Sequence, residues 1–192
     1  GGASASGAGG GAGGGASASP AVSEAVGPGD MALDELASEP WSGLVLWPGH
    51  DEHGHATMEV RLGYATRTLP KALQPRMKAV IPSHLAHARM PGGPAHGKQM
   101  AVLVDCDGLS LFRPPPLDII TAGTVTLSER FPFVCEAFYL VNTPRVMKAA
   151  IAVVKKIMHP ETRNKLRVLS PDQAAALRGQ LAGAPVVGFP GG

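Results

Sequence analysis

The sequence predicts an α/β fold, with a mostly parallel, twisted sheet covered by helices. Apolar runs typical of buried strands occur at residues 98–108, 136–142 and 166–169. Apolar residues at helical spacing occur between and after them, at residues 117–130, 144–158 and 170–181. Strands that alternate with helices are joined by crossover connections, which make neighbouring strands parallel and place helices on the faces of the sheet.

The elements before residue 98 are a hairpin and a helical segment. Residues 43–47 and 57–63 have the pattern of two strands, and the polar segment 51–56 between them carries a central Gly54. Residues 67–90 have helical spacing but contain three prolines, which predict one kinked helix or two short ones. At the other end of the chain, residues 185–189 are expected to form a last strand.

The first part of the chain has a different composition from the rest. Residues 1–22 are almost entirely Gly, Ala and Ser, so they have too few apolar side chains to offset the entropy of ordering. We therefore expect a disordered, low-complexity tail over residues 1–40 and one folded domain over residues 41–192. The chain shows neither a secretory signal pattern nor a run of the roughly 18 apolar residues that a transmembrane helix needs.

Charge and cysteine content narrow the function classes. Residues 1–60 hold eight acids and no Lys or Arg, whereas residues 61–192 hold seventeen bases and seven acids. The folded part is thus basic, which favours an anionic partner. Aromatic residues make up only 5% of the chain and fall in apolar segments, which argues against nucleic acid. The two cysteines do not form a disulfide framework, so a reducing compartment, the cytoplasm, is expected.

Short motifs for common chemistries are absent, and three weaker signals leave alternatives open. The chain lacks a P-loop, a dinucleotide-binding glycine motif and a nucleophile elbow. The segment HDEHGH (50–55) could bind a metal or simply form a turn, and His84 and His87 could share a helix face without any site. The segment DCDG (105–108) could supply a catalytic Asp or Cys, or a carboxylate that caps the next turn. We expect no metal, no cofactor and no enzymatic activity.

The order of motifs resembles the CRAL-TRIO lipid-binding domain, in its branch of phosphatidylinositol transfer proteins of the Sec-fourteen type. The resemblance rests on MAVLVDCDGLS, then ERFPF, then FYLVNTPRVMKAAIAVVKKIMHPETRNKLRVL, and it extends upstream to HDEHGHATMEVRLG and downstream to APVVGFPGG. It covers roughly residues 43–192. It implies a sheet that floors an apolar lipid cavity, with a helical gate that opens at a membrane.

The resemblance also implies a headgroup site. In the phosphoinositide-binding branch, a Thr and a Lys after the gate hold the inositol phosphate, and PETRNK supplies Thr162 and Lys165 at the matching positions. A hydroxyl and an ammonium are suitable donors to a phosphate, and charge-assisted hydrogen bonds are the stronger kind. The alternative is that HPETRNK is only a capped, solvated start of a helix.

The cavity would be lined by the apolar side of the gate and by inward positions of a strand. The candidates for the lipid pocket and gate are Phe138, Leu140, Met147, Ile151 and Val154. Ordinary core packing is the alternative for each of them. The gate also carries Lys148, Lys155 and Lys156. These lysines could attract an anionic bilayer or simply form a solvated face.

The chain also departs from the family pattern. Phe133 stands where the family has an acid, Arg145 replaces an aromatic residue, and the N-terminal helical lobe of the family has no counterpart. The resemblance implies that the chain binds a phospholipid, with phosphatidylinositol as the first candidate, and transfers or presents it without enzymatic activity. It also implies a monomer that contacts membranes transiently. The alternatives are a carrier of another hydrophobic molecule, such as a tocopherol or retinoid, and a protein-interaction module with a vestigial cavity.

Overall fold

The structure, a computed structural model, describes residues 30–181 except 111, 113, 115–116, 132, 146 and 159. It has the predicted α/β fold, with a five-stranded sheet in the order β1-β2-β3-β4-β5. The strands are β1 (Val45–His50), β2 (Ala56–Arg61), β3 (Met100–Asp105), β4 (Cys135–Val141) and β5 (Leu166–Val168). Strands β1 and β2 form the antiparallel hairpin, and the pairs from β2 to β5 are parallel.

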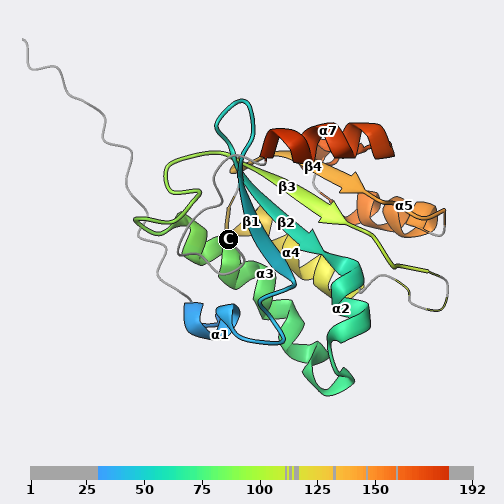
Figure 1. The fold of residues 1–192 in the computed structure, drawn as a ribbon, viewed down its shortest axis with the longest axis horizontal. Helices are drawn as coiled ribbons and strands as arrows, with labels where there is room; N and C mark the ends of the chain where they lie inside the picture. Colours follow the sequence, from blue (N-terminus) through green and yellow to red (C-terminus); the bar gives the residue numbers. More distant parts are fainter. Residues whose placement is uncertain are drawn as a thin grey trace, which may run out of the picture.

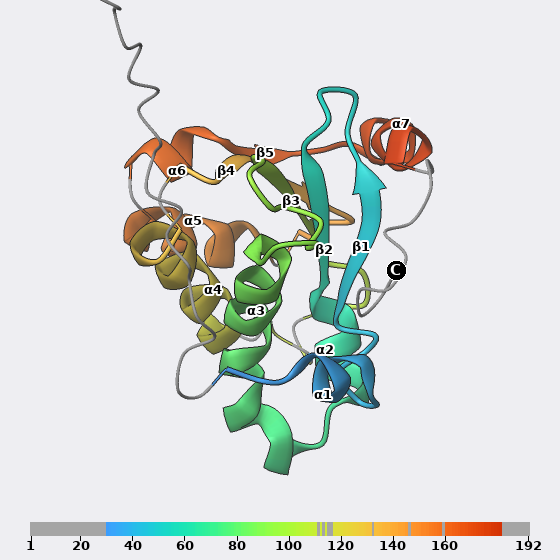
Figure 2. The same cartoon turned by 90° about the vertical axis from the view of Figure 1, so that its left-hand side faces the viewer.

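Helices cover both faces of the sheet. Figures 1 and 2 show α3, α4 and α5 on one face and α7 on the opposite face. The helices are α1 (Leu33–Ala37), α2 (Leu62–Thr68), the short 3₁₀ turn η1 (Lys71–Leu73), α3 (Gln74–Arg89), α4 (Leu117–Glu129), α5 (Met147–Ile157), α6 (Pro160–Asn164) and α7 (Pro171–Leu181). Crossover connections through α3, α4 and α5 make the central sheet parallel.

The alternation of side chains along the strands divides the core in two. Met58, Val102 and Phe138 belong to the large core under α3, α4 and α5, whereas Leu103 and Val141 pack with α7. This arrangement explains why β3 is a nearly continuous apolar run, because its first four residues are buried.

The proline-rich segment is two helices and a 3₁₀ turn, and its division differs in detail from the expectation. The strand predicted to end at residue 63 ends at Arg61, and Leu62 begins α2. Helix α3 then continues through Pro82. Residues 80–88 are buried on all sides, and this burial outweighs the roughly 3 kcal/mol that a proline costs inside a helix.

Two further expectations are corrected. The third apolar run was expected to be a buried strand, but β5 is a three-residue edge strand in which Arg167 and Val168 are exposed. The ordered chain also begins before residue 41. Met31 and Leu36, the latter on α1, are buried in the large core, so residues 30–40 pack against the domain where the sequence predicts a tail. The Gly/Ala/Ser segment 1–22 and the strand expected at 185–189 lie outside the described residues.

Residues 30–40 form a strap against α3. The backbone N–H of Met31 donates to Ser83 Oγ at 2.7 Å, and His87 Nε2 lies 2.8 Å from the Met31 carbonyl oxygen. The Asp30 carboxylate accepts from both Nη atoms of Arg130, at 3.3 and 3.2 Å. The strap thus ties together α3 and the chain just after α4.

Candidate functional site: an apolar cavity under α5

A cavity of about 80 Å³ lies inside the large core. Its floor comes from β2, β3 and β4, and its walls come from α3, α4 and α5. Sixteen described residues line it: Met58, Val60, Leu62, Ile81, Val102, Val104, Ile120, Gly123, Thr124, Leu127, Phe138, Leu140, Met147, Ile151, Met158 and Leu166. The interior predicted beneath the gate is therefore hollow.

The lining is apolar almost throughout. Of the described lining residues, Thr124 alone has a polar side chain, and its hydroxyl donates to the Ile120 carbonyl at 2.7 Å. A polar or charged group buried here would find no hydrogen-bond partner, which costs free energy. The cavity therefore suits hydrocarbon.

Two features of the helices shape the cavity. On α4, Gly123 faces Ile81, and a Cβ atom added there would lie 3.2 Å from Ile81 Cγ2. Glycine at this position therefore lets α3 and α4 approach closely. On α5, Met147 and Ile151 face the cavity, whereas Lys148, Val153 and Lys156 face solvent.

Four of the predicted pocket residues lie at the cavity. Phe138 and Leu140 on β4 and Met147 and Ile151 on α5 are among the lining residues. The side chain of Val154 lies outside the described part of the structure. Sequence reasoning missed most of the rest, because α3 and α4 were not assigned to the cavity. A contact of any of these residues with lipid stays a prediction.

The predicted headgroup residues are on α6 and just after it. Thr162 is on α6, and its side chain is not described. Lys165 follows α6 and precedes the lining residue Leu166. Its Nζ donates to the Cys135 carbonyl at 2.9 Å and lies 3.7 Å from Glu136 Oε2. The ammonium group is thus held at the start of β4, with its side chain 31% exposed.

The surface around α5, α6 and β5 is strongly basic. Residues 145–167 contain seven bases and one acid, Glu161. The bases are Arg145, Lys148, Lys155, Lys156, Arg163, Lys165 and Arg167. Among them Arg145, Lys148, Lys156, Arg163 and Arg167 are exposed. This side of the cavity therefore presents a cationic surface to solvent.

The segments that suggested other chemistries have structural roles. Both cysteines are buried, and burial raises the pKa of the Cys106 thiol and of the Cys135 thiol to about 12, so neither is a ready nucleophile. In the hairpin turn, burial acts to raise the pKa of Asp51, but hydrogen bonds from His55 and His53 outweigh it and the pKa is lowered. No three His, Cys, Asp or Glu side chains form a metal-binding group within the described ranges.

Comparison with known protein families matches residues 41–183 to the CRAL/TRIO domain. The chain belongs to the CRAL/TRIO domain family. The match starts after the strap, so residues 30–40 add core side chains beyond the region of the family match.

A solved structure supports the CRAL/TRIO fold. The chain resembles "Crystal structure of Sfh5" with a TM-score of 0.58 and 18% identity, over 72% of this chain and 51% of that chain. This chain thus spans about half the length of that neighbour. No curated protein matches the sequence. Membership in the CRAL/TRIO family supports lipid binding in general.

The described helices differ from membrane-spanning helices in length and hydropathy. None of them is both long enough and apolar enough to span a bilayer.

Proposed function

We propose that this CRAL/TRIO domain binds a phospholipid, with its acyl chains in the cavity under α5, and moves it between membranes or presents it to another protein without chemical change. The observation that carries the proposal is the cavity lining, which is apolar on the sheet and on three helices. Each buried CH₂ group contributes about 0.8 kcal/mol, so the chains supply most of the binding energy.

The cavity must enlarge to admit such a ligand. Its volume of about 80 Å³ is well below the roughly 300–1,000 Å³ of typical ligand pockets. Helix α5 is the wall suited to move, because Met147 and Met158 at its two ends are buried whereas Lys148, Ala149, Ala152 and Val153 are exposed. Outward movement of α5 would open the cavity towards the basic surface.

The proposed membrane contact follows from that surface. Each basic residue near an anionic bilayer contributes about 1 kcal/mol. The exposed bases on α5, α6 and β5 would therefore orient the mouth of the cavity towards an anionic leaflet, in a peripheral and reversible contact from the cytoplasm.

Phosphatidylinositol is the proposed ligand, with Thr162 and Lys165 at its phosphate. Lys165 supports this proposal because it precedes Leu166, which lines the cavity. The ammonium group has three protons, so it can donate to a phosphate while it keeps its bond to the Cys135 carbonyl.

A second candidate is a carrier of another hydrophobic molecule, such as a tocopherol- or retinoid-like compound. Two observations favour it: the lining has no charged side chain among the described residues, and Lys165 is already bound to the protein. A ligand with a small or uncharged polar group would need no phosphate site.

Extraction of the purified protein with solvent and mass spectrometry of the extract tests these readings. Phosphatidylinositol in the extract supports the first candidate and another apolar compound the second. A protein without any bound lipid, which also fails to take lipid from vesicles, supports the interaction module with a vestigial cavity.

A further inference from the structure

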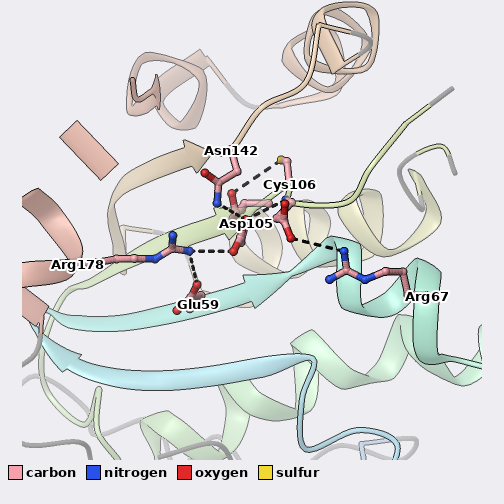
Figure 3. Close-up of polar contacts among 8 residues, drawn as sticks. Glu59, Arg67, Asp105, Cys106, Asn142 and Arg178 are labelled. Carbon is pink, nitrogen blue, oxygen red and sulfur yellow. Dashed lines mark hydrogen bonds and ion pairs between the residues drawn. The ribbon is translucent and has the colours of Figure 1, made fainter. Parts of the chain in front are cut away.

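Asp105 at the end of β3 binds three separate parts of the chain. Its Oδ2 accepts from Arg178 Nη2 on α7 at 2.8 Å. Its Oδ1 accepts from Asn142 Nδ2 at 2.9 Å, just after β4, and from the backbone N–H of Asp107 at 2.9 Å. Figure 3 shows Arg178 and Asn142 reaching Asp105 from different elements.

Arg178 also holds a second carboxylate on the same face of the sheet. Its Nη2 lies 2.8 Å from Glu59 Oε1 on β2. The side chains of Glu59 and Asp105 are only 12% and 14% exposed, so two nearly buried anions share one guanidinium. Burial acts to lower the pKa of Arg178, but its bonds to both carboxylates outweigh this effect and the pKa is raised. Charge-assisted bonds of this kind fix the position of α7 on the sheet.

Asn142 lies between β4 and α5, the wall of the cavity that is proposed to move. It has a positive φ of 51°, and Pro144 follows two residues later, before α5 begins at Met147. Asn tolerates the left-handed conformation better than most residues. The hydrogen bond to Asp105 therefore fixes the direction in which the chain leaves the sheet towards α5.

We propose that the chain Arg178–Asp105–Asn142 is a latch that couples α7, on one face of the sheet, to the position of α5 on the other. Arg178, through its bonds to Glu59 and Asp105, holds α7 on the sheet. Asp105 in turn holds Asn142, which lies before α5. Loosening either bond to Asp105 allows α5 to swing away from the cavity more often. These three are positioning residues, and they touch no ligand; the effect on lipid exchange rests on the proposed function.

Hydrogen exchange of the ligand-free 192-residue chain tests the latch independently of any lipid. Asn142→Asp keeps the backbone preference but sets a carboxylate against Asp105, and Arg178→Met removes the link to α7. We expect the α5 amides of both variants to exchange about tenfold faster, a loss of protection equivalent to one charge-assisted hydrogen bond, with β3 unchanged. Because Asn142 is exposed, Asn142→Asp keeps the test valid if Arg178→Met fails to fold.

Arg67→Gln is the matched control. Arg67 Nη1 lies 3.5 Å from Asp107 Oδ2, and among the described ion pairs Arg67 is paired with Asp107 and not with Asp105. The variant should leave exchange in α5 unchanged. Unchanged α5 exchange in Asn142→Asp, or equal acceleration in Arg67→Gln, overturns the latch.

Transfer between vesicles separates the latch from the proposed function. With vesicles that contain pyrene-labelled phosphatidylinositol, the two latch variants should release the probe faster while binding at equilibrium changes less. Faster α5 exchange with no probe bound by any variant supports the latch and contradicts phosphatidylinositol as the ligand.

Discussion

The Lys165 ammonium donates a hydrogen bond to the Cys135 carbonyl oxygen at 2.9 Å, which joins the segment after α6 to the first residue of β4. The residue proposed to hold a lipid phosphate is thereby positioned by the sheet. Among the described residues, Lys165 forms one ion pair, with Glu136, whose Oε2 lies 3.7 Å from Nζ. An anionic headgroup would have to compete with this carboxylate for the ammonium group.

Lys165→Gln tests the headgroup site. We expect phosphatidylinositol transfer to fall about tenfold, since a charge-assisted hydrogen bond to phosphate contributes roughly 1.5–3 kcal/mol. Transfer of a pyrene-labelled diacylglycerol, which has no phosphate, should stay unchanged. Arg167→Gln removes the same charge two residues away, from an exposed side chain, and serves as the control. Equal losses in both variants would assign the effect to surface charge.

Ile151→Trp tests the cavity itself. The larger ring fills the space beneath α5, where Ile151 is half-buried and lines the cavity. We expect at least a tenfold loss in uptake of any long-chain lipid, because the lost space displaces several methylene groups of about 0.8 kcal/mol each. Val153→Trp, on the exposed side of the same helix, should bind normally. Normal uptake by Ile151→Trp, measured with vesicles and native mass spectrometry, would show that lipid binds elsewhere.

His84 predicts a loss of stability in acid. It is buried in α3, and burial lowers its pKa from 6.5 to about 3. The unfolded chain therefore binds a proton that the folded chain does not, so stability is complete above pH 6.5 and falls as the pH decreases towards 3. At pH 5 the loss from this group is about 2 kcal/mol.

Urea unfolding at pH 5 and pH 7.5 measures this loss. His84→Gln keeps an acceptor for Trp47 Nε1, which lies 3.4 Å from His84 Nδ1, and should show a smaller difference between the two pH values. The same difference in both proteins would place the acid sensitivity in other groups.

Truncation tests the boundary of the folded domain. Removal of residues 1–29 should leave the free energy of unfolding unchanged. Removal of residues 1–40 deletes Met31 and Leu36, which are 2% and 0% exposed, and should cost several kcal/mol at about 1.5–3 kcal/mol for each buried side chain. Equal stability of the two truncated proteins would show that the strap adds nothing to the core.

The sequence predicted the elements whose pattern is local. The apolar run of β3 and the helical spacing in residues 144–158 each appear within one window, and the fold class follows from their alternation. The strap was missed because Met31 and Leu36 are isolated among polar and small residues. For residues 67–90 the choice between one kinked helix and two short ones stayed open, because residues 80–88 of α3 are buried on all sides and show no polar face.

The site was predictable only in part for a similar reason. Strand and gate positions such as Phe138 and Ile151 followed from the alternation and the resemblance. The contact of Lys165 with the start of β4, thirty residues earlier, depends on the register of β4 and β5, which local spacing does not contain. The same holds for Arg178, whose partners Glu59 and Asp105 lie 119 and 73 residues away along the chain.

Methionine methyl NMR with a spin-labelled lipid tests the central claim most directly. The chain has seven methionines, and three of them, Met58, Met147 and Met158, line the cavity. A phospholipid with a nitroxide on its acyl chain should broaden these three signals most strongly and the other four less: Met31, Met77, Met90 and Met100. Broadening confined to the exposed Met90, or no broadening at saturating lipid, would contradict an acyl chain bound beneath α5.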